Sequence, residues 1–324
     1  MKTVMVTGVG AIIGYGVLRS LRAARPDLRL IGSDIYPDAV GQVWCDHFVN
    51  APLTSDAAYP TWLHEQVTTN QVDLLIPAIE QDVDYLSDNR ERAVQLGCPM
   101  VLNNRKLVET ARDKWAMDQE LVSMNEPSRI ESLDRGTFEQ LSAQLGLPFL
   151  LKPRRGYASK GIVRVTDQAS YTAHATQLGN RLIAQRIVGS EDQEFTVSIF
   201  GDGTGTVLAT SCLQRRLAAD GSTSKAVSTE VAGVAEVVAR LCEHFKPEGP
   251  TNLQFRKAEG EWKLLEINPR ISSSTSIRTA FGYNESAMCV DYYLGGIIPT
   301  QPTTRRGYAA RYIEEVIVHD RDHF

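Results

Sequence analysis

The sequence predicts an α/β protein with two successive parts, first a doubly wound parallel sheet and then an α+β part built on antiparallel strands. Three observations lead to this prediction. The chain has 324 residues, enough for roughly two domains of about 150 residues each. As far as about residue 105, strand patterns alternate with helix patterns, which is typical of a parallel sheet. From about residue 147 onward, strands follow one another through glycine-rich turns, which is typical of antiparallel pairing.

The first part contains short, β-branched apolar segments separated by helix patterns. We expect strands at residues 3–8, 28–34, 72–80 and 98–103, and helices at residues 16–25, 58–70 and 82–97. Right-handed crossovers between parallel strands place the carboxyl ends of those strands along one edge of the sheet. Ligands of such sheets collect at that edge.

The second part follows a helical stretch at residues 106–124. We expect strands at residues 147–153, 161–167, 181–189, 194–203 and 205–216, and a strongly amphipathic helix at residues 230–245. Residues 249–270 predict a β-hairpin that has KAEGEW at its turn.

The composition is that of an ordinary globular protein, with 43% hydrophobic and 23% charged residues. The net charge of −5 provides no basic field for nucleic acid or an anionic membrane, so we expect small-molecule partners. Five scattered cysteines without a C-x-x-C pair favour reduced thiols over disulfides or a zinc site. Neither a signal-peptide pattern nor an apolar run of about 18 residues is present, so we expect a cytoplasmic protein. A homodimer is compatible with these properties.

A glycine-rich segment, TGVGAIIGYG, follows the first expected strand, and Asp34 ends the second. This arrangement imitates a dinucleotide fingerprint, in which glycines let the backbone approach a pyrophosphate and an acid about 20 residues later binds the ribose. The spacing is G-x-G-x-x-x-G, because Ile13 stands where the fingerprint has a glycine. An NAD(P)-dependent oxidoreductase is therefore one alternative for the function.

Lys152 ends the apolar segment LLKP and precedes a loop that contains Gly156, Ser159, Lys160 and Gly161. An ammonium is a compact point charge, and loop N–H groups donate to phosphate oxygens. This segment favours a triphosphate ligand, although by itself it is also consistent with a solvated basic loop.

The segment IAQRIVGSEDQEFTV consists of two strands joined by a short polar link. The extended stretch from Gln185 to Val188 is suited to offer backbone N–H and C=O groups to a flat base. Glu194, at the start of the second strand, is suited to accept two hydrogen bonds from a ribose diol.

The strand KLLEIN ends in polar side chains at alternate positions, Glu266, Asn268 and, if the extended path continues, Arg270. Alternate residues of a strand point to the same face. Gln254 lies on the partner strand of the hairpin, so its side-chain oxygen can converge with those of Glu266 and Asn268. Such hard oxygen ligands suit Mg²⁺. An ion pair between Glu266 and Arg270 at a sheet edge is the alternative that one such strand allows.

With these motifs in this order, the chain resembles the ATP-grasp superfamily, and most closely its carbamoyl-phosphate-synthase-like branch. The resemblance covers nearly the whole chain, and its most specific element is EINPR about a dozen residues after NLQF. It implies a Rossmann-like pre-ATP-grasp domain at residues 1–106, followed by an ATP-grasp domain with a mobile lid subdomain at residues 107–183. The C-terminal subdomain with the metal site would occupy residues 184–324.

The resemblance also implies a role for each residue that matches a family motif. The nucleotide would contact Lys114, Lys152, Ser159, Lys160, Gly161, Gln185, Arg186, Val188 and Glu194. Mg²⁺, or Mn²⁺ in its place, would be held by Gln254, Glu266 and Asn268, and Arg270 would act on the transferring phosphate. Glu80, Arg215 and Arg216 are candidates for facing the substrate, whereas a sheet-edge acid and a solvated basic pair are the alternatives for them.

The activity that the resemblance implies is ATP-dependent ligation of a carboxylate to an amine through an acyl phosphate, with ADP and phosphate as products. The sequence carries no second ATP-grasp half, glutaminase or allosteric part of a full carbamoyl phosphate synthase, so we expect a different reaction. A non-catalytic nucleotide-binding protein is the third alternative, beside the ligase and the oxidoreductase.

Overall fold

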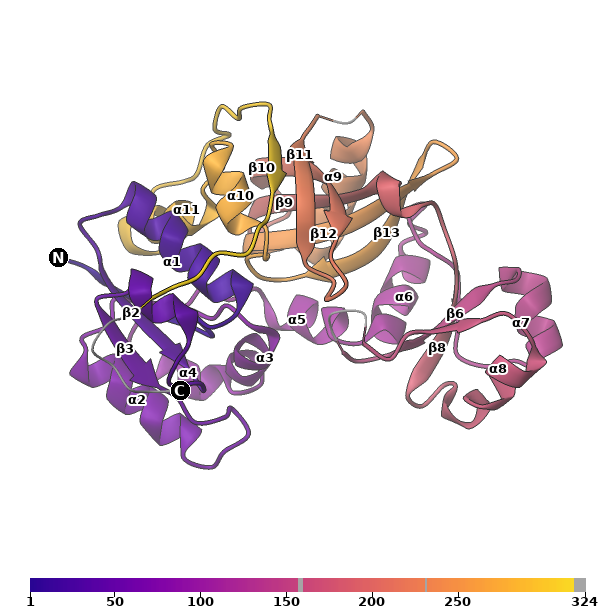
Figure 1. The fold of residues 1–324 in the computed structure, drawn as a ribbon, viewed down its shortest axis with the longest axis horizontal. Coiled ribbons are helices and arrows are strands. Elements are labelled where there is room, and N and C mark those ends of the chain that lie inside the picture. Colours follow the sequence, from indigo (N-terminus) through magenta and orange to yellow (C-terminus); the bar gives the residue numbers. More distant parts are fainter. Residues whose placement is uncertain (157–159, 231, 318–324) are drawn as a thin grey trace.

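The computed structural model describes residues 1–156, 160–230 and 232–317, which form three β-sheets with helices around them (Figure 1). The first sheet has the order β3-β2-β1-β4 and all of its strand pairs are parallel. Its strands are β1 (Thr3–Thr7), β2 (Arg29–Asp34), β3 (His47–Asn50) and β4 (Leu74–Ile76). The predicted parallel sheet is therefore confirmed.

Two details of the first sheet differ from the prediction. The strand expected at residues 98–103 forms only an isolated bridge between Met100 and Leu75, because the chain passes the sheet edge briefly before helix α5 (Arg105–Ala111). Strand β3 was not predicted, since only four residues pair with β2 and none of them is fully buried. The helices of this part are α1 (Ile12–Ala24), α2 (Tyr59–Thr69), α3 (Glu80–Asp88) and α4 (Arg90–Val94), with a 3-10 turn at Val40–Trp44.

A second, four-stranded sheet lies to one side of the molecule, in the order β5-β8-β6-β7 (Figure 1). Its strands are β5 (Ser132–Leu133), β6 (Phe149–Pro153), β7 (Val163–Val165) and β8 (Leu182–Arg186), and all of its pairs are antiparallel. Helices α7 (Phe138–Leu145) and α8 (Gln168–Thr172) and a 3-10 turn at Ala175–Gln177 accompany it. We call this sheet and its helices the lid sheet.

The helical stretch expected at residues 106–124 is two helices, α5 (Arg105–Ala111) and α6 (Lys114–Ser123). Asp113 separates them, because its side chain accepts hydrogen bonds from the N–H groups of Trp115 (2.9 Å) and Ala116 (3.4 Å). A side chain that caps a helix in this way starts a new helix at the next residue. Lys114 is therefore the first residue of α6.

The third sheet has six strands in the order β13-β12-β9-β10-β11-β14, all antiparallel. Its strands are β9 (Glu194–Asp202), β10 (Val207–Leu217), β11 (Thr223–Ser228), β12 (Glu248–Ala258), β13 (Glu261–Asn268) and β14 (Tyr308–Ala310). The helices of this part are α9 (Val234–Phe245), α10 (Thr275–Ala280) and α11 (Glu285–Gly295), with a 3-10 turn at Glu191–Gln193. The predicted hairpin turn is confirmed, since Glu259 and Gly260 join β12 to β13 with positive φ at both residues.

The amphipathic helix α9 packs its apolar face on the six-stranded sheet. Val237, Leu241 and Phe245 lie in one buried cluster with Phe195 and Phe255 of the sheet. The helix begins at Val234 instead of residue 230, because Gly233 at its N-terminus has a φ of +80°, which a right-handed helix does not continue.

Each of the three sheets lies within one of the predicted domains (residues 1–106, 107–183 and 184–324), with one exception. The limit expected at residue 183 falls inside β8, whose pairing with β5 and β6 makes it part of the lid sheet. The division into domains stays a prediction, and we place its second limit after Arg186.

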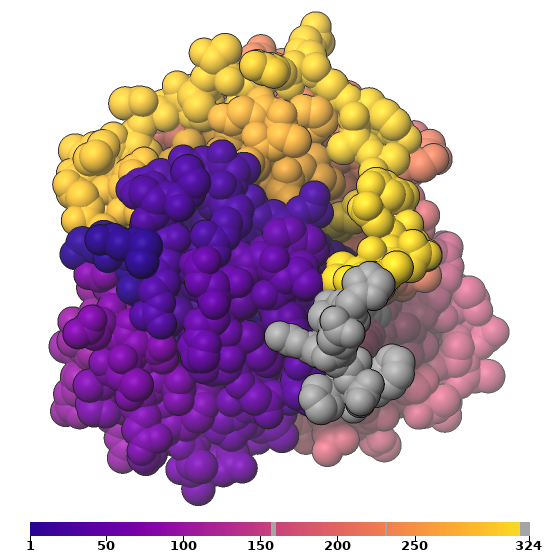
Figure 2. Space-filling view, turned by 60° about the vertical axis from the view of Figure 1, so that its left-hand side comes forward, coloured from indigo at the N-terminus to yellow at the C-terminus, as the bar shows by residue number. Residues whose placement is uncertain are grey.

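The first and third sheets share a hydrophobic core. One buried cluster contains Val6 of β1, Val17 and Leu18 of α1, and Phe200 and Tyr283 from the third part. Helix α1 packs against α10 and α11. Figure 2 shows the last described residues, in yellow, lying beside the indigo and violet N-terminal part. Because of this shared core, the C-terminal edge of the first sheet is held next to the end of β13.

Arg278 of α10 is completely buried behind this junction. Its guanidinium is surrounded by polar groups of four other segments, namely Thr196 Oγ1 (2.9 Å), Asn252 Oδ1 (3.0 Å), Ser272 Oγ and the Glu285 carboxylate (3.6 Å). A buried charge is tolerated only when it is paired and hydrogen-bonded. Arg278 therefore links strands β9 and β12 to the loop that follows β13.

We expect Arg278→Leu to lower the free energy of unfolding by about 3–5 kcal/mol, because it leaves the completely buried Glu285 carboxylate without its counter-charge. Denaturant unfolding measures the loss. Arg216→Leu is the control, since Arg216 is an exposed arginine on β10 and its loss should cost less than about 0.5 kcal/mol. Equal losses in the two variants would contradict the prediction.

No helix among the described residues is long and apolar enough to cross a membrane.

Candidate functional site

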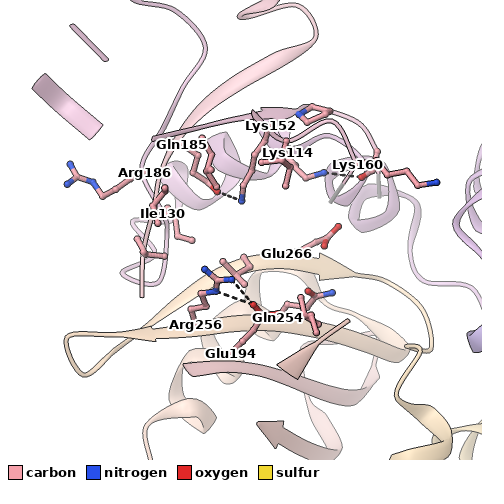
Figure 3. Close-up of a pocket in the computed structure, with 18 residues that line it drawn as sticks. Lys114, Ile130, Lys152, Lys160, Gln185, Arg186, Glu194, Gln254, Arg256 and Glu266 are labelled. Carbon is pink, nitrogen blue, oxygen red and sulfur yellow. Dashed lines mark hydrogen bonds and ion pairs between the residues drawn. The ribbon is translucent and has the colours of Figure 1, made fainter. Parts of the chain in front are cut away.

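A cavity of about 180 Å³ lies between the lid sheet and the six-stranded sheet. Figure 3 shows its two walls, with lysines on the side of the lid sheet and carboxylate and amide groups on the side of the six-stranded sheet. The predicted nucleotide and metal residues that line it are Lys114, Lys152, Lys160, Gln185, Arg186, Val188, Glu194, Gln254 and Glu266. The fold thus brings together residues from five separate segments. Their individual roles stay predictions.

The other predicted residues lie elsewhere. Gly161 borders a neighbouring groove on the lid sheet and has a φ of +74°. Asn268 and Arg270 line a second cavity, described below. Ser159 lies outside the described residues.

Two lysine ammonium groups converge on the lid side of the cavity. Lys114, the first residue of α6, donates to the carbonyl oxygen of Gly156 (3.0 Å). Lys152, near the end of β6, donates to Gln185 Oε1 (2.6 Å). Burial lowers the pKa of Lys152 to about 8, while the Glu266 carboxylate raises that pKa and the Lys114 ammonium lowers it further. The site therefore holds an incompletely compensated positive charge, as a site for a polyphosphate requires.

The lowered pKa of Lys152 predicts that binding of a nucleotide triphosphate takes up protons. Near pH 8 about half of the Lys152 side chains are neutral, and phosphate charges would raise their pKa. We expect proton uptake on Mg²⁺-ATP binding to be largest near pH 8, and the affinity to fall above that pH. Calorimetric titration in buffers of different ionisation enthalpy measures the uptake.

Lys152→Arg is the matched control, because a guanidinium stays charged and should abolish the proton uptake near pH 8. In wild-type protein without ligand the same pKa has a second consequence. The unfolded chain binds more protons than the folded one between about pH 8 and 10.5, so this group makes stability rise with pH across that window. A binding enthalpy that does not depend on the buffer would contradict the assignment of Lys152.

The predicted base-binding segment begins inside β8. Gln185 pairs with both β5 and β6, and its side chain contacts Lys152 and Ser132 Oγ (2.9 Å). The side chain of Arg186 points away from the cavity (Figure 3) and reaches the Glu131 carboxylate (3.0 Å). Ile187 and Val188 follow β8. Their backbone N–H and C=O groups are therefore not used in strand pairing and are available to a base. Apolar side chains complete this end of the cavity, namely Ile130, Leu150, Ile162 and Leu265.

Glu194 is buried at the opposite wall and is held by two arginines. Arg215 Nη2 lies 3.0 Å from Oε1, and Arg256 donates to Oε2 at 3.0 and 3.1 Å. A carboxylate has about four acceptor positions, so this pairing leaves capacity for a ribose hydroxyl. Sequence reasoning missed Arg256, although it stands two residues after Gln254 on β12 and therefore shares its face.

The structure does not bring Arg215 and Arg216 together. Arg215 is buried and donates to Gln254 Oε1 (2.6 Å) as well as to Glu194. Arg216, the next residue of β10, points to the opposite face and is exposed. Arg215 therefore supports the floor of the nucleotide cavity, which the sequence did not indicate, since it offered the two arginines as one pair.

Two of the predicted metal ligands are neighbours across the hairpin. Gln254 lies opposite Glu266 across β12 and β13, and Asn252 lies opposite Asn268. No described residue donates a hydrogen bond to the Glu266 carboxylate, which projects into the cavity (Figure 3). The amide oxygens of Gln254 and Asn268 each accept from an arginine, at 2.6 and 3.5 Å, and each keeps a second lone pair.

This donor set fits Mg²⁺, which prefers oxygen ligands and keeps positions for water and phosphate. It offers one carboxylate to which no described residue donates and two partly engaged amide oxygens, which by themselves make a weak site. The described residues contain no cluster of three or more His, Cys, Asp or Glu side chains arranged for a metal ion. The triphosphate would therefore have to supply further ligands.

Arg270 lies beyond the end of β13, where the chain turns. The extended path assumed from the sequence does not continue, because β13 ends at Asn268 and the N–H of Arg270 donates to the Asn268 carbonyl (2.8 Å). The guanidinium pairs with Glu80 and donates to the Ile271 carbonyl (2.9 Å). The alternative of an ion pair with Glu266 is therefore wrong. Two residues that the sequence considered separately, Glu80 and Arg270, form one pair.

A second cavity of about 280 Å³ contains this pair. Its lining includes Glu80, Glu266, Asn268, Arg270 and Gly156. Glu266 and Gly156 line both cavities, so the two meet at the proposed metal site.

The glycine-rich turn after β1 takes part in hydrogen bonds and packing within the protein itself. Asp34, the acid of the dinucleotide fingerprint, accepts from the N–H groups of Gly10 (2.7 Å) and Tyr36 (3.1 Å). A Cβ on Gly14 would lie 2.2 Å from the Gly8 carbonyl oxygen, so this glycine lets α1 pack closely on the turn. The fingerprint thus has a structural explanation, which weakens the oxidoreductase alternative.

Comparison with known proteins agrees with this architecture. Residues 5–101 match the family model "PylC-like, N-terminal domain", and residues 187–316 match "ATP-grasp in the biosynthetic pathway with Ter operon". Carbamoyl phosphate synthase large chains are similar at low identity. That of Methanothermobacter thermautotrophicus is 21% identical over 293 residues, which cover 83% of this chain, and that of Methanosarcina mazei is 23% identical over 209 residues, which cover 58%. The matched regions span only 27% and 18% of those relatives.

Solved structures with the same fold cover nearly all of the chain. The N5-carboxyaminoimidazole synthetase from Staphylococcus aureus complexed with ADP has a TM-score of 0.74 at 15% identity, covering 94% of this chain and 80% of that one. The L-amino acid ligase from Bacillus licheniformis has a TM-score of 0.68 at 16% identity, covering 91% and 74%. At these identities the likeness concerns the fold.

The three sheets have the fold of these solved ligases. The family matches give the chain a PylC-like N-terminal part and an ATP-grasp part, and the chain is similar to carbamoyl phosphate synthase large chains at low identity.

Proposed function

We propose that the protein is an ATP-dependent carboxylate–amine ligase that works through an acyl phosphate and releases ADP and phosphate. The observation that carries this proposal is the meeting of the two cavities at Glu266. One cavity has the charges and apolar walls for a nucleotide. The other begins where its phosphates would end and contains Arg270, as a substrate site for phosphoryl transfer requires.

In the proposed reaction an oxygen of the substrate carboxylate attacks the γ-phosphorus while the bond from that phosphorus to ADP breaks. The amine nitrogen then attacks the acyl carbon, phosphate leaves with the bonding electrons, and the nitrogen loses a proton. The first step brings one anion to another. Lys114, Lys152 and Arg270 would offset that repulsion and stabilise charge on the transferring oxygens.

Gln254, Glu266 and Asn268 would hold Mg²⁺ in this complex. When bound, Mg²⁺ supplies a Lewis acid that neutralises phosphate charge. The lid sheet carries Lys152 and forms part of one wall of the nucleotide cavity. We propose that it closes over the nucleotide and excludes water, which would otherwise hydrolyse an acyl phosphate.

Solved relatives named as an L-amino acid ligase and as N5-carboxyaminoimidazole synthetases support a ligase. The low share of the carbamoyl phosphate synthase chains that is matched gives no support for that particular reaction. A non-catalytic nucleotide-binding protein is the second candidate, because the proposed metal site has a single carboxylate and two amide oxygens that arginines already engage.

We expect Mg²⁺-ATP to stabilise the protein against thermal unfolding and NADPH to leave it unchanged. A ligand at about 100 times its dissociation constant stabilises by about 2.7 kcal/mol. A thermal-shift titration with each nucleotide makes the comparison. Stabilisation by NADPH but not by Mg²⁺-ATP would reverse the order of the candidates.

Turnover decides between a ligase and a binding protein. We would measure phosphate release from ATP across a grid of carboxylates (amino acids, dipeptides and uronic acids) and amines, including ammonia. The proposal requires release that depends on both a carboxylate and an amine. ATP binding without release in any combination would favour the binding protein.

A further inference from the structure

Three carboxylates stand at intervals of four on helix α3, namely Glu80, Asp84 and Asp88. Residues four apart on a helix lie on the same face. All three line the second cavity. The other charged side chains that line this cavity belong to other segments, namely Arg112 after α5, Arg155 after β6, Glu266 of β13 and Arg270 after β13.

The first and last carboxylates are neutralised by arginines. Glu80 pairs with Arg270. Both oxygens of Asp88 accept from Arg112 Nη1 at 2.8 Å. These two pairs stand at either end of the helix, and Asp84 lies between them.

Asp84 forms neither a hydrogen bond nor an ion pair within the described part of the chain. It is partly buried, and burial raises the pKa of its carboxyl group, with Asp88 and Glu80 adding to the rise and Arg112 and Arg155 opposing it. A partly buried carboxylate without a partner is costly unless a ligand supplies the counter-charge. Among the described residues, Asp84 is therefore the carboxylate of this helix face that is open to the counter-charge of a ligand.

The shape of the cavity favours an organic cation over a metal ion. The described residues form no group of three acidic or other metal-ligating side chains close enough for a metal. Apolar side chains form part of the wall, namely Val83, Val108, Ala111 and Ile267. A cation that carries an alkyl body matches both features.

We propose that the second cavity binds the amine substrate of the ligase as its ammonium ion and that Asp84 is the residue that recognises the charge. The ammonium gives one proton to the Asp84 carboxylate before the neutral amine attacks the acyl carbon. That the ligand is a substrate follows from the proposed function, on which this inference rests. The same cavity contains Arg270 and Glu266, so an amine held there lies next to the end of the nucleotide cavity. Glu80 and Asp88 stay paired with their arginines and leave Asp84 as the one carboxylate on this helix face for the ammonium.

The test uses butylamine as a cationic probe and 1-butanol as its neutral counterpart, each titrated by NMR into the full-length protein with Mg²⁺ and a non-hydrolysable ATP analogue. We expect wild-type protein to bind butylamine about tenfold or more tightly than 1-butanol. Asp84→Asn should reduce that preference to about twofold or less. Glu91→Gln is the matched control, since Glu91 is an exposed carboxylate on the neighbouring helix α4, and it should keep the wild-type preference.

Asp84→Glu provides a second variant if Asp84→Asn does not fold. This variant keeps the charge but moves it by one methylene. The preference for butylamine over 1-butanol should therefore fall severalfold without disappearing. The pH dependence gives an independent readout, because the preference should weaken as the pH falls through the raised pKa of Asp84. Equal binding of the two probes to wild-type protein, or an unchanged preference in folded Asp84→Asn or Asp84→Glu protein, would overturn the proposal.

The outcome separates this inference from the proposed function. An ammonium preference that depends on Asp84, found in a protein that turns over no ATP, would support the site and remove the ligase. Ligation of a carboxylate to an amine with the same KM for the amine in Asp84→Asn and wild-type protein would support the ligase and remove the role of Asp84.

Discussion

Glu266→Gln is expected to abolish magnesium-dependent ATP turnover. Glu266 supplies the only carboxylate among the three proposed metal ligands, because the other two are the amides Gln254 and Asn268. Both amide oxygens already accept from arginines, whereas no described residue donates to Glu266. Replacing its anionic oxygen by a neutral one removes the strongest attraction for a divalent cation. We expect kcat to fall by a factor of at least about 10²–10³.

The substitution should leave the fold unchanged, since glutamine has nearly the same shape and the described residues give the Glu266 side chain no hydrogen bond to lose. Glu261→Gln is the control at the other end of the same strand, where the carboxylate is exposed and pairs with Lys263 (2.7 Å). Phosphate release is measured for both variants as a function of Mg²⁺ concentration. Near-wild-type, magnesium-dependent turnover by purified Glu266→Gln protein would remove the metal assignment.

The Glu266 variant has a second expected effect, on Lys152. The Glu266 carboxylate raises the pKa of Lys152, so its removal should lower that pKa further below 8. The pH of maximal proton uptake on nucleotide binding should therefore move downward in Glu266→Gln protein. This shift is measured by binding alone and does not depend on turnover.

Arg270→Ala is expected to lower kcat by about 10²–10³ and to change the KM for ATP little. The reason is the position of the guanidinium, which lies in the second cavity next to the proposed metal site, whereas Lys114 and Lys152 line the nucleotide cavity. Arg270 would thus meet the phosphoryl group as it is transferred and would contribute little to bound ATP. Arg270→Lys keeps the charge but loses the planar fork, so it should also be impaired.

The ion pair with Glu80 requires its own control. Arg270→Ala leaves the Glu80 carboxylate without its partner, and this alone could disturb the cavity. Glu80→Gln removes the carboxylate and keeps the guanidinium, so it separates the two effects. We expect Glu80→Gln to retain more activity than Arg270→Ala. A large rise in KM with unchanged kcat in Arg270→Ala protein would make Arg270 a nucleotide anchor, and wild-type kinetics would leave it a structural partner of Glu80.

Much of the candidate site was predictable because its parts are local. The hairpin of β12 and β13 was predictable from its turn residues. A bulge between Gln254 and Phe255 shifts the register that the turn sets by one residue, so that Gln254 lies opposite Glu266 and not Leu265. Lys152 was recognisable from its position at the end of an apolar strand. Arg256 was equally accessible, since it shares a strand face with Gln254, and the carboxylates of α3 were visible in their spacing of four.

Other parts depended on contacts that no local pattern contains. Glu80 and Arg270 are 190 positions apart, and their pairing requires the first sheet to pack against the end of β13. Asp34 matched a ribose-binding acid in the sequence, but its side chain is occupied by two backbone N–H groups. The chain turns after Asn268, so strand alternation could not place Arg270 correctly.

For the segments that carry the candidate site, the sequence by itself determined which are strands and helices, because hydrophobic periodicity and turn residues act over a few positions. It thereby determined that Lys152, Glu194 and Asn268 stand at or near strand ends and that Lys114 stands in a helical stretch. Only the tertiary structure decided which of these charges meet and which remain free. Arg215 supports Glu194, Arg270 holds Glu80, and within the described chain Asp84 stays without a partner, because such pairings follow from how distant segments pack and each buried charge must find its counter-charge there.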